Sequence, residues 1–506
     1  MAKGRKSRTE LKSSKLKHHS RNKNRLSSPF SSFAQKFPVQ MQSWKDTRLP
    51  NMLWACLLAS GMKREAYFSL CHAMCDVAHA RSEEAFQFIT HQRLAEADAE
   101  TFLQVMIPIT ETPDAISILR PIRLLRTLPD AAHWETILSD PVPETDWHSL
   151  AKAIALCFDH QSQPSTDVRW LKLMYFVASG KMRMPPNMLE RLLNYPADEN
   201  HNTSGGFARA SESNFSMEID GKTPSIDGAF DTEAFWKECY ESSSCHPAAM
   251  EKDNSVDSEK IAHELLALYE AVAIHFSKTI ASTDIDPRHD SSFALVLYAL
   301  YLLLGLTSTR LDQRAEGRVT LRCIAEAFIT LHWLTKKDDP SIWTQHRNYG
   351  VGQSKLSLLK NVDLDEVPDF LDLSELEVYA NEDYWQEFTD IDLGAWANKN
   401  LRTLADESGA KEVYDKYYDW SSAYVHSNWG ALRDTVMTPC LNPLHRFHRV
   451  PRSPKFEMPS VLADGSKLVN RMIDDLNTLY PTFKPRISWH HKESGDKTKA
   501  GKPSRE

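Results

Sequence analysis

Cysteine is sparse in this chain and irregularly spaced. Its eight cysteines show no paired spacing of the kind that disulfide frameworks or zinc knuckles use. Scattered thiols are typical of proteins that stay in a reducing compartment. We therefore expect a cytoplasmic protein, and at 506 residues the chain is long enough to form sizeable cores without help from disulfides or metals.

Long apolar runs are also missing. The most apolar stretch, FALVLYALYLLLGL at 293–306, has fourteen residues, whereas a helix that spans a bilayer needs about 20. This stretch predicts a buried core helix, and we expect no membrane partner. The N-terminal segment lacks the apolar core of a signal peptide.

Several catalytic signatures are absent. The chain has no phosphate-binding glycine loop, no G-x-S-x-G elbow and no H-E-x-x-H motif, which leaves nucleotide hydrolases, serine hydrolases and zincins without support. Alternating strand patterns are absent as well, whereas apolar residues recur at helical spacing almost everywhere. The fold class that this predicts is all-α.

Positive charge is concentrated at the N-terminus. The net charge is -8, yet the first 25 residues hold ten Lys and Arg against one acid, Glu10. Such an arm could neutralise the phosphates of RNA or DNA, or it could serve only as a solubilising tail. The same two interpretations apply to the basic segment 484–506.

Shifts in composition divide the chain into five parts. We expect a disordered basic arm at 1–39, a helical domain of short, possibly stacked helix pairs at 40–195, a flexible linker at 196–258, a helical bundle at 259–437 and a Pro-rich, basic extension with one helix at 438–506. Within the linker, which is rich in Ser, Gly, Asn and Asp, the stretch FDTEAFWKECY could dock as a short helix.

One polar helix of the predicted bundle covers GRVTLRCIAEAFITLHWL. Its core face is expected to carry Ile324, Ala327, Phe328 and Leu331. On the opposite side stand Arg322 and Glu326, four residues apart and able to pair. Because that side also carries Ile329 and Trp333, we expect a half-buried site or an interface there rather than a solvated face.

A second polar helix is expected over YYDWSSAYVHSNWGALRD, residues 417–434. With His426 as the reference direction, Asp415, Asp419, Ser422 and Arg433 lie within about 40° of it on one continuous helix. His426 would act as a general acid or base, and Ser422 would hydrogen-bond substrate or water.

Asp419 would then orient the imidazole of His426, and Arg322 or Arg433 would stabilise a phosphate. These groups would suit RNA cleavage through the 2′-hydroxyl and require no metal. The alternative is a polar network that only holds helices together, and the residues leave both interpretations open.

Two motifs together carry a resemblance over about residues 259–437. The R-x-x-x-E helix, with Arg322 and Glu326, followed by a Y-x-x-x-S-x-x-x-H helix, with Tyr418, Ser422 and His426, resembles a bacterial helical domain family of unknown function that is similar to divergent HEPN-type bundles. This resemblance implies a metal-independent ribonuclease or an inactive relative of one, found in toxin and antiphage defence systems and often a homodimer.

An active HEPN helix usually carries an arginine shortly before its histidine. In this sequence the position five residues before His426 is Ser421. Our hypothesis is that Arg322, from the neighbouring helix, could substitute in space for that arginine.

Together these observations define one candidate site and two functions. The predicted catalytic residues are His426, Ser422, Arg322 and Glu326, and the predicted substrate-binding residues are Asp419, Tyr418 and Arg433. No cofactor and no metal are expected, and RNA is the expected partner, through the site and the N-terminal arm. The first function is a ribonuclease-like effector; the second is a non-catalytic binding or oligomerisation protein whose polar stripe recognises a partner or small ligand.

Two further patterns contain metal or phosphate ligands. Cys71, Cys75 and His79 share one helical face, with His91 downstream, but core packing is the favoured interpretation over a zinc site because structural zinc needs a fourth ligand. The stretch HRFHRV at 445–450 could contact phosphate, and we favour a solvated basic turn.

Overall fold

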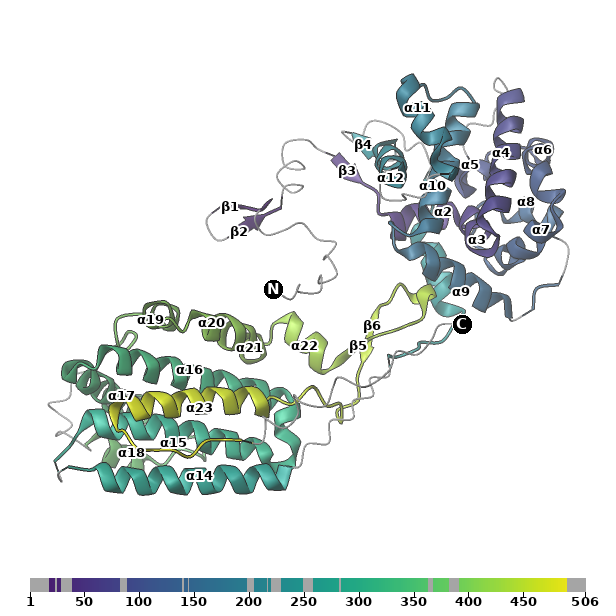
Figure 1. Ribbon diagram of the computed structural model, residues 1–506. Coiled ribbons are helices and arrows are strands. Elements are labelled where there is room, and N and C mark those ends of the chain that lie inside the picture. Colours follow the sequence, from purple (N-terminus) through teal and green to yellow (C-terminus); the bar gives the residue numbers. More distant parts are fainter. Residues whose placement is uncertain are drawn as a thin grey trace. The chain divides into compact units, whose positions relative to one another are not determined.

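The molecule is mostly helical, as the helical periodicity of its sequence predicts and as the computed structural model in Figure 1 shows. The structure describes residues 18–22, 25–28, 39–81, 89–138, 141–143, 145–197, 204–215, 217–219, 229–248, 258–281, 284–362, 367–381 and 391–488. Strands in these ranges form only two-stranded pairings, β1–β2, β3–β4 and β5–β6. The predicted all-α class is confirmed.

The chain divides into two units, which we describe separately. Unit 1 comprises Met1–His246 with Pro439–His448, and unit 2 comprises Pro247–Thr438 with Arg449–Glu506. Unit 1 is therefore discontinuous in sequence, because ten residues near the C-terminal end complete it.

The elements of unit 1 are β1 (Ser20–Asn22), β2 (Arg25–Ser27), β3 (Val39–Met41), η2 (Trp44–Arg48), α2 (Leu49–Asn51), α3 (Leu53–Gly61), α4 (Arg64–Ala80), α5 (His91–Ala95), α6 (Ala99–Thr110), α7 (Pro113–Leu119), η3 (Arg120–Leu124), α8 (Ala131–Ile137), α9 (Thr145–Phe158), α10 (Gln163–Ala178), α11 (Pro186–Leu193), η4 (Tyr195–Ala197), α12 (Ser204–Phe215), β4 (Met217–Ile219), α13 (Thr232–Glu241) and η8 (Pro443–His445). Polar side chains cap several of these helices at the N-terminus and accept backbone N–H bonds there, among them Thr90, Asp98, Ser162 and Asp231.

Helix α10 lies at the centre of unit 1. The buried indole of Trp170 meets the Phe68 ring edge-on at 4.9 Å and donates its N–H to the carbonyl of Leu192 at 2.6 Å. Cys71 and Cys75 are buried in the same core, which confirms core packing for the two cysteines, whereas His79 on that face is exposed.

The stretch expected to be a flexible linker, 196–258, instead contributes two helices to unit 1. Helix α12 brings Glu212, and α13 buries Phe235 and Trp236. A Ser- and Gly-rich composition predicted disorder, but one buried ion cluster and two aromatic rings hold these segments in place. The expected short helix within FDTEAFWKECY is confirmed by α13.

Most of the expected basic arm, and the C-terminal residues after 488, lie outside the described residues. Within the arm, β1 and β2 pair antiparallel, with Ser20 opposite Ser27.

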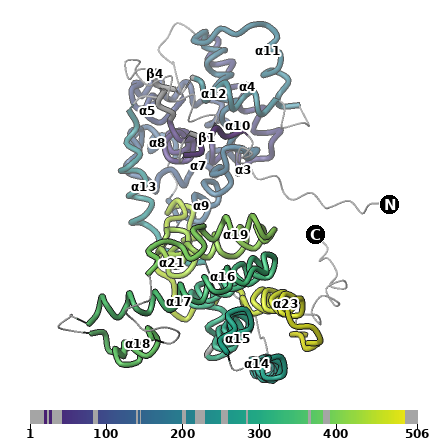
Figure 2. Tube along the Cα trace, turned by 90° about the vertical axis from the view of Figure 1, so that its left-hand side faces the viewer, coloured from purple at the N-terminus to yellow at the C-terminus, as the bar shows by residue number. Residues whose placement is uncertain are grey.

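The elements of unit 2 are α14 (Ser258–Thr279), α15 (Pro287–Thr307), η5 (Ser308–Gln313), α16 (Ala315–Lys337), α17 (Pro340–Asn361), α18 (Leu373–Ala380), α19 (Leu401–Ser408), α20 (Lys411–Val413), η7 (Tyr414–Tyr418), α21 (Asp419–Val425), α22 (Trp429–Thr435), β5 (Met437–Pro439), β6 (Arg449–Pro451) and α23 (Leu462–Leu479). Both Figure 1 and Figure 2 show α15 between α14 and α16, and α16 and α15 also pack on α23. The helix expected near the C-terminal end is α23; it lies in the bundle core, because Leu468, Met472 and Ile473 are all buried.

Helix α15 is long and apolar enough, by length and composition, to cross a membrane. Its inner face is nevertheless covered, since Phe293, Val296, Leu300 and Leu303 are buried in the core of unit 2. The prediction of a buried core helix at 293–306 is confirmed for this face, whereas Tyr298 and Tyr301 on the outer face are exposed.

Helix α16 orients its side chains as its periodicity predicts. Ile324, Ala327, Phe328 and Leu331 are all buried, which confirms the predicted core face. Trp333, on the other side, is buried as well. The helix is thus covered on two sides.

Gly317, in the first turn of α16, allows a close backbone approach. A Cβ at this position would lie 2.8 Å from the carbonyl oxygens of both Leu311 and Asp312, which are backbone atoms of η5. We expect Gly317→Ala to lower the free energy of unfolding by about 1–3 kcal/mol through this overlap, although alanine favours helices. Chemical denaturation measures the change, with Gly350→Ala as the control, because a Cβ there meets nothing within 4 Å. Equal stability of the two variants would contradict the close approach.

Candidate ligand-binding site

The segment expected to be one helix at 417–434 is broken in the middle. Helix α21 ends at Val425, and α22 begins at Trp429. Between them Ser427 has a left-handed backbone (φ 49°), and Asn428 is extended at the N-cap of α22. The single-helix prediction is wrong here because short polar residues favour such turn and cap conformations over the helix interior.

The break changes which residues share a face. Arg433 no longer follows His426 along one helix, and its Nε donates to the adjacent Asp434 at 2.8 Å. His426 is exposed at the C-terminal end of α21, where its amide donates to the carbonyl of Ser422. Asp419 is also exposed.

Arg322 and Tyr418 are the predicted residues that the structure brings into direct contact. Arg322 Nη2 donates to the Tyr418 hydroxyl at 2.8 Å, and the guanidinium carbon lies 4.5 Å from the centre of the ring. Glu326 is exposed, and no ion pair joins it to Arg322 among the described residues. Ser422 also contacts Tyr418, because its hydroxyl donates to the backbone carbonyl of Tyr418, four residues earlier, at 2.7 Å.

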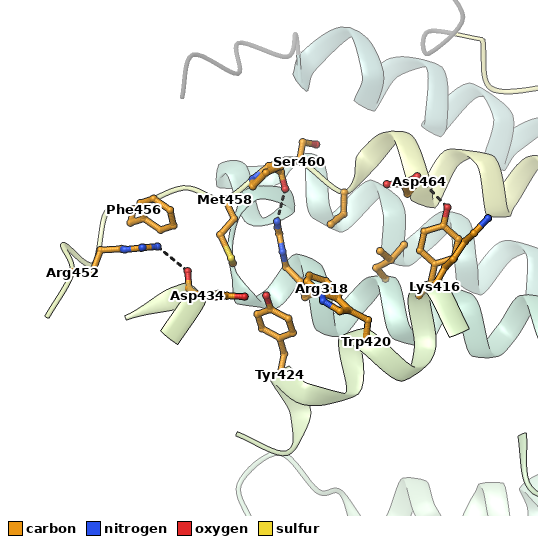
Figure 3. A pocket seen from close by; sticks show the side chains of 14 residues that line it. Arg318, Lys416, Trp420, Tyr424, Asp434, Arg452, Phe456, Met458, Ser460 and Asp464 are labelled. Carbon is orange, nitrogen blue, oxygen red and sulfur yellow. Dashed lines mark hydrogen bonds between the residues drawn. The ribbon is translucent and has the colours of Figure 1, made fainter. Parts of the chain in front are cut away.

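A cavity of about 440 Å³ lies next to Arg318, which is one turn closer than Arg322 to the N-terminus of α16 (Figure 3). Its walls come from α16, from η7 and α21, from the end of α22, and from the segment that runs from β6 into α23. The lining residues are Arg318, Leu321, Lys416, Tyr417, Trp420, Tyr424, Asp434, Arg452, Phe456, Met458, Pro459, Ser460, Val461 and Asp464. All of them belong to unit 2.

The guanidinium of Arg318 forms the floor of this cavity. It is buried, and it donates to the carbonyls of Asp312 (Nη1, 3.0 Å) and Pro459 (Nη2). Its Nε is also buried and has no hydrogen-bond partner among the described residues. Burial lowers the pKa of Arg318 from its usual value, an effect that the hydroxyl of Tyr424 opposes. The charged side chain thus lacks part of its solvation.

Aromatic rings and a second arginine form the walls. Trp420 is half exposed at 51%, and Tyr424 stands beside Arg318 (Figure 3). Arg452 lies over the ring of Phe456, with its guanidinium carbon 3.7 Å from the centre, and donates to the carbonyl of Asp434 at 2.8 Å.

On the remaining side, Tyr417 donates its hydroxyl proton to Asp464 at 3.1 Å. Burial and this carboxylate raise the pKa of Tyr417 to about 12. Tyr417 therefore stays neutral at physiological pH. Flat rings next to fixed cations can bind a planar group that carries negative charge.

The sequence held part of the signal for this cavity. Arg318 stands four residues before Arg322, and Tyr417, Trp420 and Tyr424 recur at helical spacing. The sequence prediction was based on the polar residues that share a helical face with His426, and it therefore did not include these rings. The segment around Phe456 arrives from a separate part of the chain, and no local pattern predicts that it completes the wall.

Comparison with known proteins gives one match, and it covers part of unit 2. No curated protein and no solved structure matches the chain. Residues 298–439, which run from α15 to β5 and include Arg318, Arg322, Tyr418 and His426, match the model described as "Family of unknown function (DUF5677)". This segment is thus similar to an uncharacterised family, and its described residues are mostly helical.

Proposed function

We propose that unit 2 binds a small planar anion in the cavity at Arg318. The observation that carries the proposal is a buried, poorly solvated guanidinium, that of Arg318, which lines the cavity together with the rings of Trp420, Tyr424 and Phe456. A volume of about 440 Å³ lies within the range of about 300–1,000 Å³ that small-molecule sites occupy.

The charges of the lining side chains favour an anion over a cation. Of the three basic groups, Arg318 is buried, and the negative charge of an entering carboxylate or phosphate would offset part of what its positive charge has lost in solvation. The acidic groups are already engaged, since Asp464 accepts hydrogen bonds from Tyr417 and Lys467. An aromatic ring bearing a carboxylate, sulfonate or phosphate is the class of ligand that these contacts would select.

Binding is best tested with 8-anilinonaphthalene-1-sulfonate and the four nucleoside monophosphates as probes. For any of these probes that binds, we expect Trp420→Ala to weaken the binding by about tenfold, because loss of one stacking face costs about 1–2 kcal/mol. Titration by isothermal calorimetry or tryptophan quenching gives the affinity.

The matched control is Trp429→Ala, which removes a more exposed indole (60%) that does not line the cavity. If both variants bind the probes as the unaltered protein does, or if no probe binds, the binding proposal fails.

A metal-independent ribonuclease is the second candidate. The exposed imidazole of His426 supports it, because an accessible histidine can exchange protons with a bound RNA. Total RNA and tRNA incubated with the protein in EDTA would be cleaved, and His426→Ala would stop the cleavage while leaving the binding of small anions intact. Intact RNA in this assay would favour the binding function alone.

The wider setting of this candidate rests on the motif resemblance. Under it, the protein is a bacterial toxin or antiphage effector in the cytoplasm, acts as a homodimer, and contacts RNA through its basic arm. Its active site would combine Arg322 and Ser422 with His426.

A further inference from the structure

Four potential metal ligands meet in unit 1, outside the site described above. They are Cys245, Cys440, His445 and His448, and one ligand atom from each lies within 4.8 Å of all the others. Cys245 follows α13, whereas the other three lie on the stretch that joins β5 to β6. Cys245 and His445 are 200 residues apart in sequence, which is why no local spacing revealed the cluster.

Three sulfur-to-nitrogen distances within the cluster match those of a tetrahedral site, and the remaining ligand atoms lie within 4.8 Å of one another. Cys245 Sγ lies 3.5 Å from His445 Nδ1 and 3.3 Å from His448 Nε2, and Cys440 Sγ lies 3.6 Å from His445 Nδ1. With zinc bonds of about 2.3 Å to sulfur and 2.0–2.1 Å to nitrogen, the sulfur-to-nitrogen edge of a tetrahedron is about 3.5 Å. The four atoms are therefore gathered closely enough to surround one ion.

The surrounding hydrogen bonds prepare the ligand atoms for a metal. Nε2 of His445 lies 3.2 Å from the carbonyl of Ser243; donation there leaves Nδ1 with its lone pair directed at the cluster. The amide of His246 donates to Cys440 Sγ at 3.3 Å, which stabilises a thiolate. Asn442 is buried and donates to the carbonyl of Ser244 at 2.9 Å.

The backbone between the two histidines is held in an uncommon shape. Arg446 and Phe447 both have left-handed backbones (φ 51° and 54°), a conformation that is unfavourable for residues other than glycine. This turn directs both imidazoles to the same point. His445 is buried, so the prediction of a solvated basic turn at 445–450 is wrong for that residue.

We propose that Cys245, Cys440, His445 and His448 form a structural zinc site. Two thiolates with two imidazoles suit Zn²⁺ among the common divalent ions, and four protein ligands leave no open position for catalysis. The ion would fix the β5–β6 turn to the end of α13 within unit 1, and this inference is independent of the function proposed for unit 2.

The first test is the metal content of the full-length protein, purified in a reducing buffer without a metal-affinity step. We expect about one zinc per chain by mass spectrometry. Cobalt exchanged into the site should give tetrahedral d–d bands and a thiolate charge-transfer band. A reduced protein that contains no zinc and takes up no cobalt would overturn the proposal, as would a Cys245–Cys440 disulfide in freshly isolated protein.

Variants identify the ligands. Cys245→Ser alters an exposed thiol, so folding should be preserved while zinc affinity, measured by competition with a chromogenic chelator, falls at least about 100-fold. Cys323→Ser, in unit 2, is the matched control and should keep its zinc. Cys440→Ser repeats the test at a buried position, with circular dichroism to confirm folding. Equal zinc affinity in Cys245→Ser and Cys323→Ser would exclude Cys245 as a ligand and refute the four-residue site.

Discussion

Replacing Glu212 with glutamine should lower the free energy of unfolding of unit 1 by about 3–5 kcal/mol. Glu212 on α12 is buried and lies among three buried cations, Arg48, Arg169 and Lys172. The Glu212 carboxylate lies 3.2 Å from both Arg169 Nε and Lys172 Nζ, and it also pairs with Arg48. Without its charge, the three cations would lose the buried carboxylate that they share.

The effect should depend on pH. Burial alone would raise the pKa of Glu212, but the charges of Lys172, Arg48 and Arg169 outweigh it and lower the pKa from 4.5 to about 2. Because the folded protein holds the carboxylate ionised more strongly than the unfolded chain does, the stabilisation is complete above pH 4.5 and is lost as the pH falls toward 2. The difference in the free energy of unfolding between the unaltered protein and Glu212→Gln should therefore shrink as the pH falls from 4.5 toward 2.

Denaturant unfolding combined with hydrogen exchange of unit 1 peptides measures this difference. The control is Glu135→Gln, since Glu135 is exposed on α8 of the same unit. A loss for Glu212→Gln no larger than that of the control would show that the cluster contributes little net stability.

Phe328→Ala should destabilise unit 2 by about 3–5 kcal/mol. The ring is fully buried on α16, stacks on the imidazole of His332 at 5.3 Å, and lies beneath the guanidinium of Arg471 of α23, 4.4 Å from the ring centre. Truncation removes apolar burial and leaves a cavity where two central helices meet.

Calorimetry of the full-length protein, with hydrogen exchange of α16 and α23 peptides, measures the loss. Phe370→Ala is the matched control because its ring is 89% exposed, and it should change stability by less than about 0.5 kcal/mol. Equal effects of these two truncations would contradict the packing of α16 on α23.

The predictable part of this protein is what short-range periodicity determines. The spacing of Ile324, Phe328 and Leu331 is enough to identify the buried face of α16, because a helix repeats every 3.6 residues wherever it lies. The sequence does not predict the helix break after His426, because the apolar spacing continues on both sides of it. The chain changes direction at a single left-handed residue, Ser427.

Long-range partners account for the remaining errors. Glu212 stands in a Ser- and Gly-rich stretch that resembles a linker, and only its distant partners on η2 and α10 explain its order. Within the candidate site, Arg322 and Tyr418 meet as the two-helix motif suggests, although Arg322 contacts the tyrosine rather than Glu326. No pattern within a short window contains Cys245 together with His445.

The discontinuity of unit 1 sets an order of events during synthesis. A ribosome releases residues 1–246 long before residues 439–448, so the nascent N-terminal part must wait for the buried side chains of Leu444 and Cys440. Most of unit 2 emerges in the interval, but its bundle must wait even longer, because the core residues of α23, such as Leu468 and Met472, follow residue 448. Maturation of the first half of the chain thus depends on translation of nearly all of the second.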